Sequence, residues 1–310
     1  MRLLVVTARY PTPDRPAAGA FVRDRLGDPD LQATVIAPHR YGGSRWGRFA
    51  RLAWEAASTR GRFDGVEAHF VLAAGPPALI AARLRRLPLV VYAHGADVGD
   101  VAQRSLVHRW LARRVIQSAA AVVANSAETA EQVGRLGGHA EVIPPGIELA
   151  RFTPSPRPSS RRVLYLGGDV PEKGVDVARR LADTLVGPGI RELDPAEVPA
   201  LMASHDVVLV PSRVEPYGLV AAEAIASGRW VVASAVGGLT DIVTDGVTGT
   251  LVADSAFEAA LASVPDYDPV LVAANAARFS VERYRLAMSQ VWDRVLETQR
   301  PARRSGQGTK

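Results

Sequence analysis

One turn between a buried strand and a helix constrains the fold of this chain more than any other stretch. The apolar, β-branched run Val207–Val210 is typical of a strand buried in a parallel sheet. Residues 221–227 contain neither Gly nor Pro and predict a helix. Pro211, Pro216 and Gly218 lie between the two and indicate a turn. In open α/β sheets, ligands bind at such turns, where a strand ends and a helix begins.

Two carboxylates frame this turn. Glu215 comes just before the predicted helix, and Glu223 lies about one turn into it. Between them are the backbone N–H groups of Gly218, Leu219 and Val220, which have no partner within a helix and favour an anion. Carboxylates accept hydrogen bonds from hydroxyl groups, so the turn suits a sugar, a diphosphate and a ribose in a row. The alternative interpretation makes Glu223 a solvated helix residue and Glu215 a capping acid.

The rest of the chain alternates between short apolar runs and helical patterns. In its first part we expect strands at 3–6, 33–37, 65–70, 89–92 and 121–124, and helices at 45–57, 77–86, 104–117 and 128–136. Residues 152–162, rich in Pro, Ser and Arg, predict an interdomain linker. The pattern predicts an α/β protein with two Rossmann-like, doubly wound parallel-sheet domains that face a cleft, at residues 1–150 and 151–280.

Composition narrows the classes of function. The chain has no Cys, which excludes disulfides, thiolate metal sites and Cys nucleophiles. No apolar run approaches the roughly eighteen residues of a membrane span. Residues 1–7 are typical of a strand rather than a signal peptide. We therefore expect a cytoplasmic protein.

Positive charge is concentrated in the first 150 residues, with 19 Arg against 13 acidic residues. Such a surplus suits nucleic acid, an anionic membrane or a phosphorylated acceptor. Only two lysines occur, Lys173 and Lys310, so the excess of Arg is consistent with genome base composition, and we predict no nucleic-acid partner. The basic helix at 45–57 suits a membrane surface, but packing on its own sheet is the favoured interpretation. Its expected apolar stripe comprises Trp46, Phe49, Ala50, Ala53 and Ala57.

Further motifs extend from the turn over residues 211–249. They are Pro211-Ser212, Glu-Pro-Tyr-Gly-Leu at 215–219, Glu-Ala-Ile-Ala-Ser-Gly at 223–228, Val-Val-Ala-Ser at 231–234, Gly-Gly-Leu at 237–239 and Asp-Gly-Val-Thr-Gly at 245–249. This stretch resembles the retaining glycosyltransferases of family 4, which have the two-domain GT-B fold. The resemblance implies that Glu215 binds the donor sugar and that Glu223 binds the ribose of a nucleotide. The donor would then be a nucleotide-diphosphate sugar, acting as co-substrate, with no other cofactor.

The first domain carries two weaker likenesses to the same family. His94 opens a His-Gly-x-Asp motif after a predicted strand, and the matching His of the family sits at the reacting face of the donor sugar. Asp97, the last residue of that motif, either contacts the donor or only fixes the loop. Gly19 resembles the end of a loop that closes over donor and acceptor, with a plain surface turn as the alternative. We interpret His69 as structural.

The second domain departs from the family pattern at one position. Lys173-Gly174 matches a Lys-Gly pair whose cation neutralises the donor diphosphate, but Gly168 stands where the family usually has an Arg. Arg213 is a candidate to supply the missing charge. The stretch 179–205 is also shorter than the corresponding stretch of the family usually is, so we expect this domain to be shortened.

No fixed metal is predicted. Asp266-Tyr267-Asp268 resembles a metal-binding Asp-x-Asp, but it lies between prolines and not at the end of an apolar strand. Because the sequence offers no plausible cluster of metal ligands, we expect metal-independent transfer, and the resemblance implies front-face attack. The acceptor, a small molecule or glycan, is not identified by the sequence. The alternatives are a nucleotide-sugar epimerase or hydrolase, or a nucleotide-binding relative without turnover.

The end of the chain is expected to return to the first domain. Residues 281–297 predict an amphipathic helix, and in GT-B proteins the corresponding helix packs on the first domain. Residues 298–310 are polar and basic without periodicity, so we expect a disordered tail. The sequence does not predict the oligomeric state.

Overall fold

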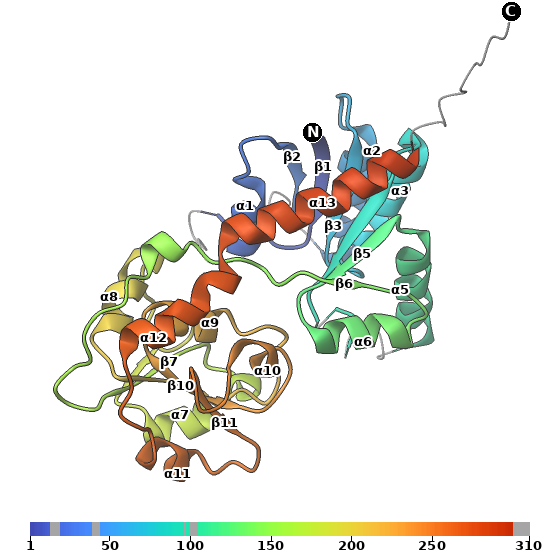
Figure 1. Ribbon diagram of the computed structural model, residues 1–310. Coiled ribbons are helices and arrows are strands. Elements are labelled where there is room, and N and C mark those ends of the chain that lie inside the picture. The colour runs from blue at the N-terminus through green and yellow to red at the C-terminus, as the bar shows by residue number, and fades with distance from the viewer. Residues whose placement is uncertain (13–18, 39–43, 96, 100–104, 300–310) are drawn as a thin grey trace, which may run out of the picture.

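The computed structural model describes residues 1–12, 19–38, 44–95, 97–99 and 105–299. The chain forms two lobes, each built around one parallel sheet (Figure 1). The first sheet has the order β2 (Gln32–Ile36), β1 (Arg2–Thr7), β3 (Gly65–His69), β4 (Leu89–Ala93), β5 (Ala121–Ala124) and β6 (Glu141–Val142). The second has the order β11 (Gly249–Val252), β10 (Trp230–Ser234), β9 (Val207–Val210), β7 (Val163–Leu166) and β8 (Thr184–Val186). The predicted fold class is confirmed.

Helices cover both faces of the first sheet and so create two apolar cores. One core contains side chains from α2 (Arg45–Ser58), α3 (Gly75–Arg85), α5 (Leu106–Ser118) and α6 (Ala127–Arg135). The other contains side chains from α1 (Ala20–Leu26) and the last helix, α13 (Val281–Gln299). Because both faces are covered, the strands β1, β3 and β4 are buried along nearly their whole length.

The second sheet is covered by shorter helices around one large and one small core. These are α7 (Val175–Leu181), α8 (Val198–Ala203), α9 (Leu219–Ala226), α10 (Leu239–Ile242), α11 (Phe257–Ala262) and α12 (Pro269–Ala274). Four 3₁₀ turns, at Leu149–Arg151, Pro171–Lys173, Pro195–Glu197 and Asn275–Phe279, connect or precede them among the described residues. Between β7 and β9 only the three-residue strand β8 joins the sheet, so this half of the domain is small.

The strand order fixes where a ligand is expected. Counting strands within each domain, the second sheet has the doubly wound order 2-1-3-4-5, and the first has the same order with a sixth strand at its edge. Successive strands are added toward one edge of such a sheet from its first strand and toward the other edge from its third, and the crevice at the carboxyl ends of these two strands binds ligands. In the first domain these are β1 and β3, and in the second β7 and β9. The loops after these strands, and after β4 next to β3, therefore form the expected site.

Helix α2 packs on the sheet, but with a different face from the one predicted. Its fully buried residues are Leu52 and Ala56. Ala50, which was placed in the buried stripe, is exposed, and the side chain of Trp46 lies outside the described set. Leu52 and Ala56 are four residues apart and so share one helix face. The predicted stripe was wrong at Ala50, whereas Phe49, Ala53 and Ala57 are partly buried and flank this face.

Helix α13 crosses from the second lobe and lies along the first (Figure 1). Its buried residues Tyr284, Met288 and Trp292 share a core with strands β1 and β4. The crossing is fixed by backbone bonds at Ile147, whose N–H donates to Phe279 and whose carbonyl accepts from Val281. Thr298 and Gln299 still belong to α13, and the rest of the predicted disordered tail lies outside the described residues. Within the ranges given above, no helix is both long and apolar enough to cross a membrane.

Candidate active site

The turn after β9 presents an open helix amino end. Helix α9 begins after Gly218, whose φ of 106° is accessible mainly to Gly. A Cβ at Gly218 would also lie 2.9 Å from the Leu239 side chain. Within the described structure, the backbone N–H groups of Gly218, Leu219 and Val220 donate no hydrogen bond. Free N–H groups at the amino end of a helix favour an anion.

Glu215 is held on the same turn by two side chains. Its Oε2 atom lies 2.7 Å from Lys173 Nζ and accepts a hydrogen bond of 3.1 Å from the Ser212 hydroxyl. The turn carrying Lys173 is pressed against the end of β9, since a Cβ at Gly174 would lie 1.9 Å from the Pro211 carbonyl oxygen. The structure therefore brings Lys173 and Glu215 together as an ion pair, with both side chains partly accessible.

Arg213 is paired with Asp176 and makes no contact with Glu215 or Lys173 among the described residues. Its guanidinium makes two 2.8 Å hydrogen bonds to the Asp176 carboxylate and a further one to the Pro171 carbonyl. Bidentate pairing of this kind holds the fork of Arg in a fixed orientation. The pairing raises the pKa of Arg213 and lowers the pKa of Asp176 to about 2. Both side chains are more than half exposed, so Arg213 faces solvent beside α7.

Glu223 lies on α9, one turn beyond the free N–H groups. It is partly buried, and no hydrogen bond to its carboxylate is found among the described residues. Burial raises the pKa of Glu223 to about 7, with Arg151 lowering it and Asp24 raising it. Asp24 belongs to α1 of the first domain, so Glu223 is positioned near the junction of the domains. An unpaired carboxylate here is suited to accept hydroxyl hydrogens.

His94 follows β4 on the first domain, and Asp97 fixes its loop. Asp97 accepts hydrogen bonds from the backbone N–H groups of His94, at 3.0 Å, and of Val71. Burial raises the pKa of Asp97 to about 6, against the effect of these backbone bonds. The geometry therefore gives Asp97 a loop-fixing contact, while His94 remains partly accessible.

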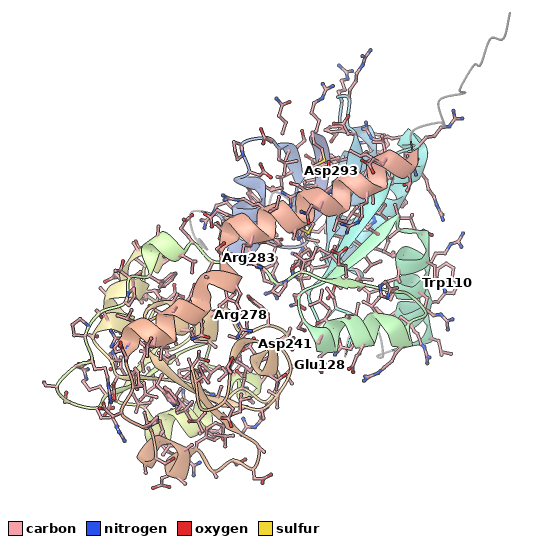
Figure 2. All side chains as sticks on the ribbon, viewed as in Figure 1. Trp110, Glu128, Asp241, Arg278, Arg283 and Asp293 are labelled. Atoms are coloured by element: carbon pink, nitrogen blue, oxygen red, sulfur yellow. The ribbon has the colours of Figure 1, made fainter. Side chains whose placement is uncertain are left out.

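The two loops meet across the domain junction. A Cβ built at Gly95 would lie 2.5 Å from Pro216 Cβ, so the His94 loop touches the turn that carries Glu215. Close by, Asp241 accepts a 2.9 Å hydrogen bond from the backbone N–H of Ala127. Figure 2 shows Asp241 and Glu128 at the boundary between the lobes. Residues predicted from separate motifs thus converge at one place.

Gly19 precedes α1 with a φ of 76°, and a Cβ there would lie 2.5 Å from the Arg9 carbonyl oxygen. The positive φ and this close approach both favour Gly. Most of the loop before Gly19, residues 13–18, lies outside the described residues. The first-domain loops at 40–48 and 98–104 are likewise described only in part.

Gly168 can accommodate a side chain. Its φ is not positive, and the nearest atoms to a Cβ there, from Pro188 and Val170, are 3.8 Å away. The missing Arg therefore does not reflect a backbone that requires Gly. A side chain at position 168 would extend from the end of β7, at the switch point of the second sheet.

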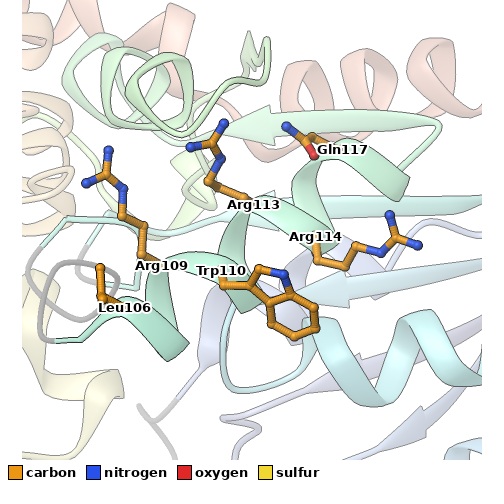
Figure 3. A pocket seen from close by; sticks show the side chains of 6 residues that line it. All are labelled: Leu106, Arg109, Trp110, Arg113, Arg114 and Gln117. Atoms are coloured by element: carbon orange, nitrogen blue, oxygen red, sulfur yellow. The ribbon is translucent and has the colours of Figure 1, made fainter.

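Two other features lie apart from this site. Asp266 pairs with Arg157, and Asp268 caps α12 by accepting from the Val270 N–H. Across the described part of the chain, no three His, Asp or Glu side chains gather closely enough to hold a metal ion. A hollow on the surface of α5 (Figure 3) contains none of the predicted site residues. It is lined by Leu106, Arg109, Trp110, Arg113, Arg114 and Gln117.

Sequence reasoning missed a buried polar group behind His94. Glu67 and Arg25 are fully buried, and His69, interpreted only as structural, lies between Glu67 and His94. A signal was present: Glu67 and His69 interrupt the apolar strand β3 at alternate positions, and alternate side chains share one face.

Two family models together match residues 2–264. Residues 2–151 match the model described as Glycosyltransferase Family 4, and residues 149–264 match the model described as Glycosyl transferases group 1. The D-inositol 3-phosphate glycosyltransferase 1 of Catenulispora acidiphila is 30% identical over 312 residues, covering 80% of this chain and 74% of the relative. The chain belongs to glycosyltransferase family 4.

Other family 4 relatives are matched over less of their length. The D-inositol 3-phosphate glycosyltransferase of Geodermatophilus obscurus is 32% identical, over 66% of this chain and 59% of the relative. The chain thus spans less than two thirds of the length of the first relatives it matches.

Solved structures share the GT-B fold of this family 4 chain. HepE from Anabaena, in complex with UDP, superposes with a TM-score of 0.72 at 20% identity, covering 95% of this chain and all of HepE. Sucrose-phosphate synthase from Thermosynechococcus elongatus gives a TM-score of 0.73 at 18% identity, covering 96% of this chain and all of that protein.

Proposed function

We propose that this protein is a retaining glycosyltransferase that moves a sugar from a nucleotide-diphosphate sugar to a hydroxyl group of a phosphorylated polyol. The observation that carries the proposal is the contact between the Gly95 loop and the Pro216 turn. It sets His94 and Glu215 at the same junction, beside the free N–H groups of α9. Family membership and the UDP complex of HepE support a nucleotide-sugar donor.

The proposed reaction breaks the bond between the anomeric carbon and the diphosphate. Negative charge then grows on the diphosphate, where Lys173 and the N–H groups of Gly218, Leu219 and Val220 would stabilise it. Glu215 would accept hydrogen bonds from the sugar, and Glu223 from the ribose. The acceptor oxygen forms its bond on the face that the diphosphate leaves, and its proton passes to the departing phosphate. Because protein groups supply the positive charge, no divalent metal is required.

The acceptor class is proposed from the relatives and from one cation. Relatives named D-inositol 3-phosphate glycosyltransferases act, by that name, on a polyol phosphate. Arg9 follows β1 at the switch point of the first sheet, is exposed, and is close enough to His94 to contribute to lowering its pKa. A guanidinium in this position suits the phosphate of an acceptor. Arg9→Gln should therefore raise the KM for D-inositol 3-phosphate while leaving the KM for the donor nearly unchanged.

The test is a transfer assay with UDP-, GDP- and ADP-sugars and D-inositol 3-phosphate. Release of nucleoside diphosphate that depends on the acceptor, with a product of the donor's anomeric configuration by NMR, is the expected result. Free sugar and nucleotide formed equally well without acceptor would instead identify a hydrolase, and a changed donor sugar an epimerase. Nucleotide-induced thermal stabilisation without turnover of any donor would favour a binding protein.

A further inference from the structure

A chain of buried hydrogen bonds runs from the last helix to His94. Trp292 Nε1–H donates to Glu67 Oε2 at 2.7 Å, and Glu67 Oε1 lies 3.0 Å from His69 Nε2. His69 Nδ1 lies 3.2 Å from His94 Nε2. Trp292, Glu67 and His69 are fully buried, whereas His94 is partly accessible. The chain therefore connects the interior of the first domain with the domain junction.

Glu67 is an ionised acceptor in this chain. Burial raises its pKa, but the charge of Arg25 and the bonds from His69 and Trp292 outweigh burial and lower the pKa to about 2. The Arg25 guanidinium lies 3.7 Å from Glu67 Oε2, which is close enough for charge pairing but too long for a hydrogen bond. A carboxylate of this kind can only accept.

Matching donors to acceptors along this chain of hydrogen bonds places the hydrogens on the two histidine rings. The carboxylate requires His69 Nε2 to carry a hydrogen. With its one hydrogen on Nε2, the His69 ring has a bare Nδ1, which accepts from His94 Nε2–H. The second ring nitrogen of His94, Nδ1, is left with a free lone pair. Burial, with nearby His69 and Arg9, lowers the pKa of His94 well below its ordinary value, so His94 is neutral at physiological pH.

The His94 ring is also held sterically. Its centroid lies 4.5 Å from that of Phe21, 4.5 Å from that of Phe70 and 4.6 Å from that of Tyr92. Phe21 belongs to α1, Phe70 directly follows β3, and Tyr92 belongs to β4. They restrict ring rotation, so the hydrogen bond that His94 donates to His69 selects both the orientation and the tautomer.

We propose that Glu67 and His69 are positioning residues that hold His94 as its Nε2–H tautomer, so that Nδ1 accepts a hydrogen bond from a hydroxyl group of the donor sugar. The hydrogen bond between His94 and the sugar rests on the proposed function, whereas the tautomer of His94 does not. Trp292 extends the arrangement to α13, because its indole N–H occupies the second oxygen of Glu67. Docking of the C-terminal helix is thereby linked to the state of His94.

The decisive measurement is ¹⁵N NMR of the full chain labelled at histidine, between pH 6 and 8. His94 is expected as the neutral Nε2–H form, with its resonances assigned from the spectrum of His94→Gln. A His94 that carries its hydrogen on Nδ1, or a His69 protonated on both nitrogens, would overturn the proposal. This result does not depend on turnover, so it stands or falls separately from the proposed function.

The variant Glu67→Gln gives a sharper test. The Trp292 N–H should donate to the amide oxygen of this variant. The amide N–H₂ group then faces His69 Nε2, which must accept a hydrogen bond from it. His69 becomes the Nδ1–H tautomer and donates to His94, which moves its own hydrogen to Nδ1. The predicted change is thus a tautomer reversal at His94, and an unchanged His94 spectrum in the folded variant would refute the linkage.

Activity adds a matched pair of variants at His69. The Oδ1 atom of His69→Asn can take the place of Nδ1 as acceptor for His94, whereas His69→Leu has no acceptor. We expect His69→Leu to lower kcat at least tenfold and His69→Asn to retain most of it, at equal thermal stability. Equal losses in the two variants would reduce the role of His69 to packing.

Discussion

Lys173 Nζ lies 2.7 Å from Glu215 Oε2, so the cation expected at the leaving group and the carboxylate expected at the sugar form one ion pair. The pair joins the turn after β7 to the turn after β9, on either side of the switch point. A diphosphate bound at the amino end of α9 would share the Lys173 ammonium with Glu215. Lys173 would then orient the diphosphate and, through Glu215, the sugar on the two sides of the bond that breaks.

This arrangement predicts a large effect for Lys173→Ala. Removing a charged donor from a developing anion typically costs about 3 kcal/mol, or roughly a hundredfold in rate. We expect kcat to fall by about that factor in steady-state assays. Arg213→Ala is the matched control, since Arg213 is paired with Asp176, and it should stay within about threefold of the parent. If Arg213→Ala loses most of its kcat while Lys173→Ala keeps nearly all of it, the leaving group binds at Arg213 and not at Lys173.

Position 168 offers a gain-of-function test. Gly168 has space for a Cβ and lacks a positive φ, so an Arg is tolerated there. Gly168→Arg should tighten binding of nucleoside diphosphates, measured by calorimetry, because a guanidinium pairs with phosphate oxygens. Gly168→Gln has a long polar side chain without charge and should leave the Kd nearly unchanged. Equal effects of Arg and Gln would show that the charge does not reach the diphosphate.

The domain junction predicts that Gly95 tolerates no side chain. Ala at a φ of 90° is strained, and its Cβ would lie 2.5 Å from Pro216. Gly95→Ala should cost about 1–3 kcal/mol in the free energy of unfolding. By displacing the His94 loop it should also lower kcat/KM about ten- to a hundredfold. Gly134→Ala is the control: position 134 lies in α6 with open space around it, so Ala should stabilise by about 0.5–1 kcal/mol. A fully active Gly95→Ala would argue against close apposition of the two loops during turnover.

Metal dependence is checked directly with a chelator. Lys173 and the α9 N–H groups are proposed to carry the charge of the leaving group, so EDTA should leave the rate nearly unchanged. The assay should include add-back of Mg²⁺ and Mn²⁺. Loss of activity with EDTA and its recovery with either ion would overturn the metal-free proposal.

The parts of the site that the sequence predicts are those fixed by local pattern. The strand, turn and helix around Glu215 are encoded by adjacent residues, and the doubly wound topology then brings strand ends together. This topology sets His94 and Glu215 at the carboxyl ends of strands in their own sheets, and the packing of the two domains brings the two loops together. The buried face of α2 was misplaced because Ala residues surround Leu52 and Ala56 and blur the apolar period.

The side-chain pairings that long-range packing creates were not predictable. Trp292 reaches Glu67 only because α13 returns across the first sheet. His69 reaches His94 only because β3 pairs with β4 in the register that sets His69 beside Tyr92. Neither relationship leaves a local sequence signal. An acidic residue and a His within an apolar strand indicate only that some buried partner exists.

The last prediction concerns pH and Glu223. Burial raises its pKa from an ordinary value of 4.5 to about 7, so the folded protein holds this proton at a pH where the unfolded chain has lost it. The contribution of Glu223 to stability should therefore decline as pH rises from about 4.5 to 7, and Glu223→Gln should remove this part of the pH dependence of Tm.

Nucleotide binding should follow the opposite trend. If the ionised carboxylate accepts the ribose hydroxyls, UDP should bind more tightly as pH rises, with the Kd improving up to about tenfold per unit below pH 7 and levelling off above it. UDP itself titrates in this range, and Glu223→Gln, measured by the same calorimetric titrations, reports that background. Glu223→Ala should largely abolish the thermal shift caused by UDP. Parallel pH profiles for the parent and Glu223→Gln, with unchanged UDP affinity in Glu223→Ala, would show that Glu223 does not bind the ribose.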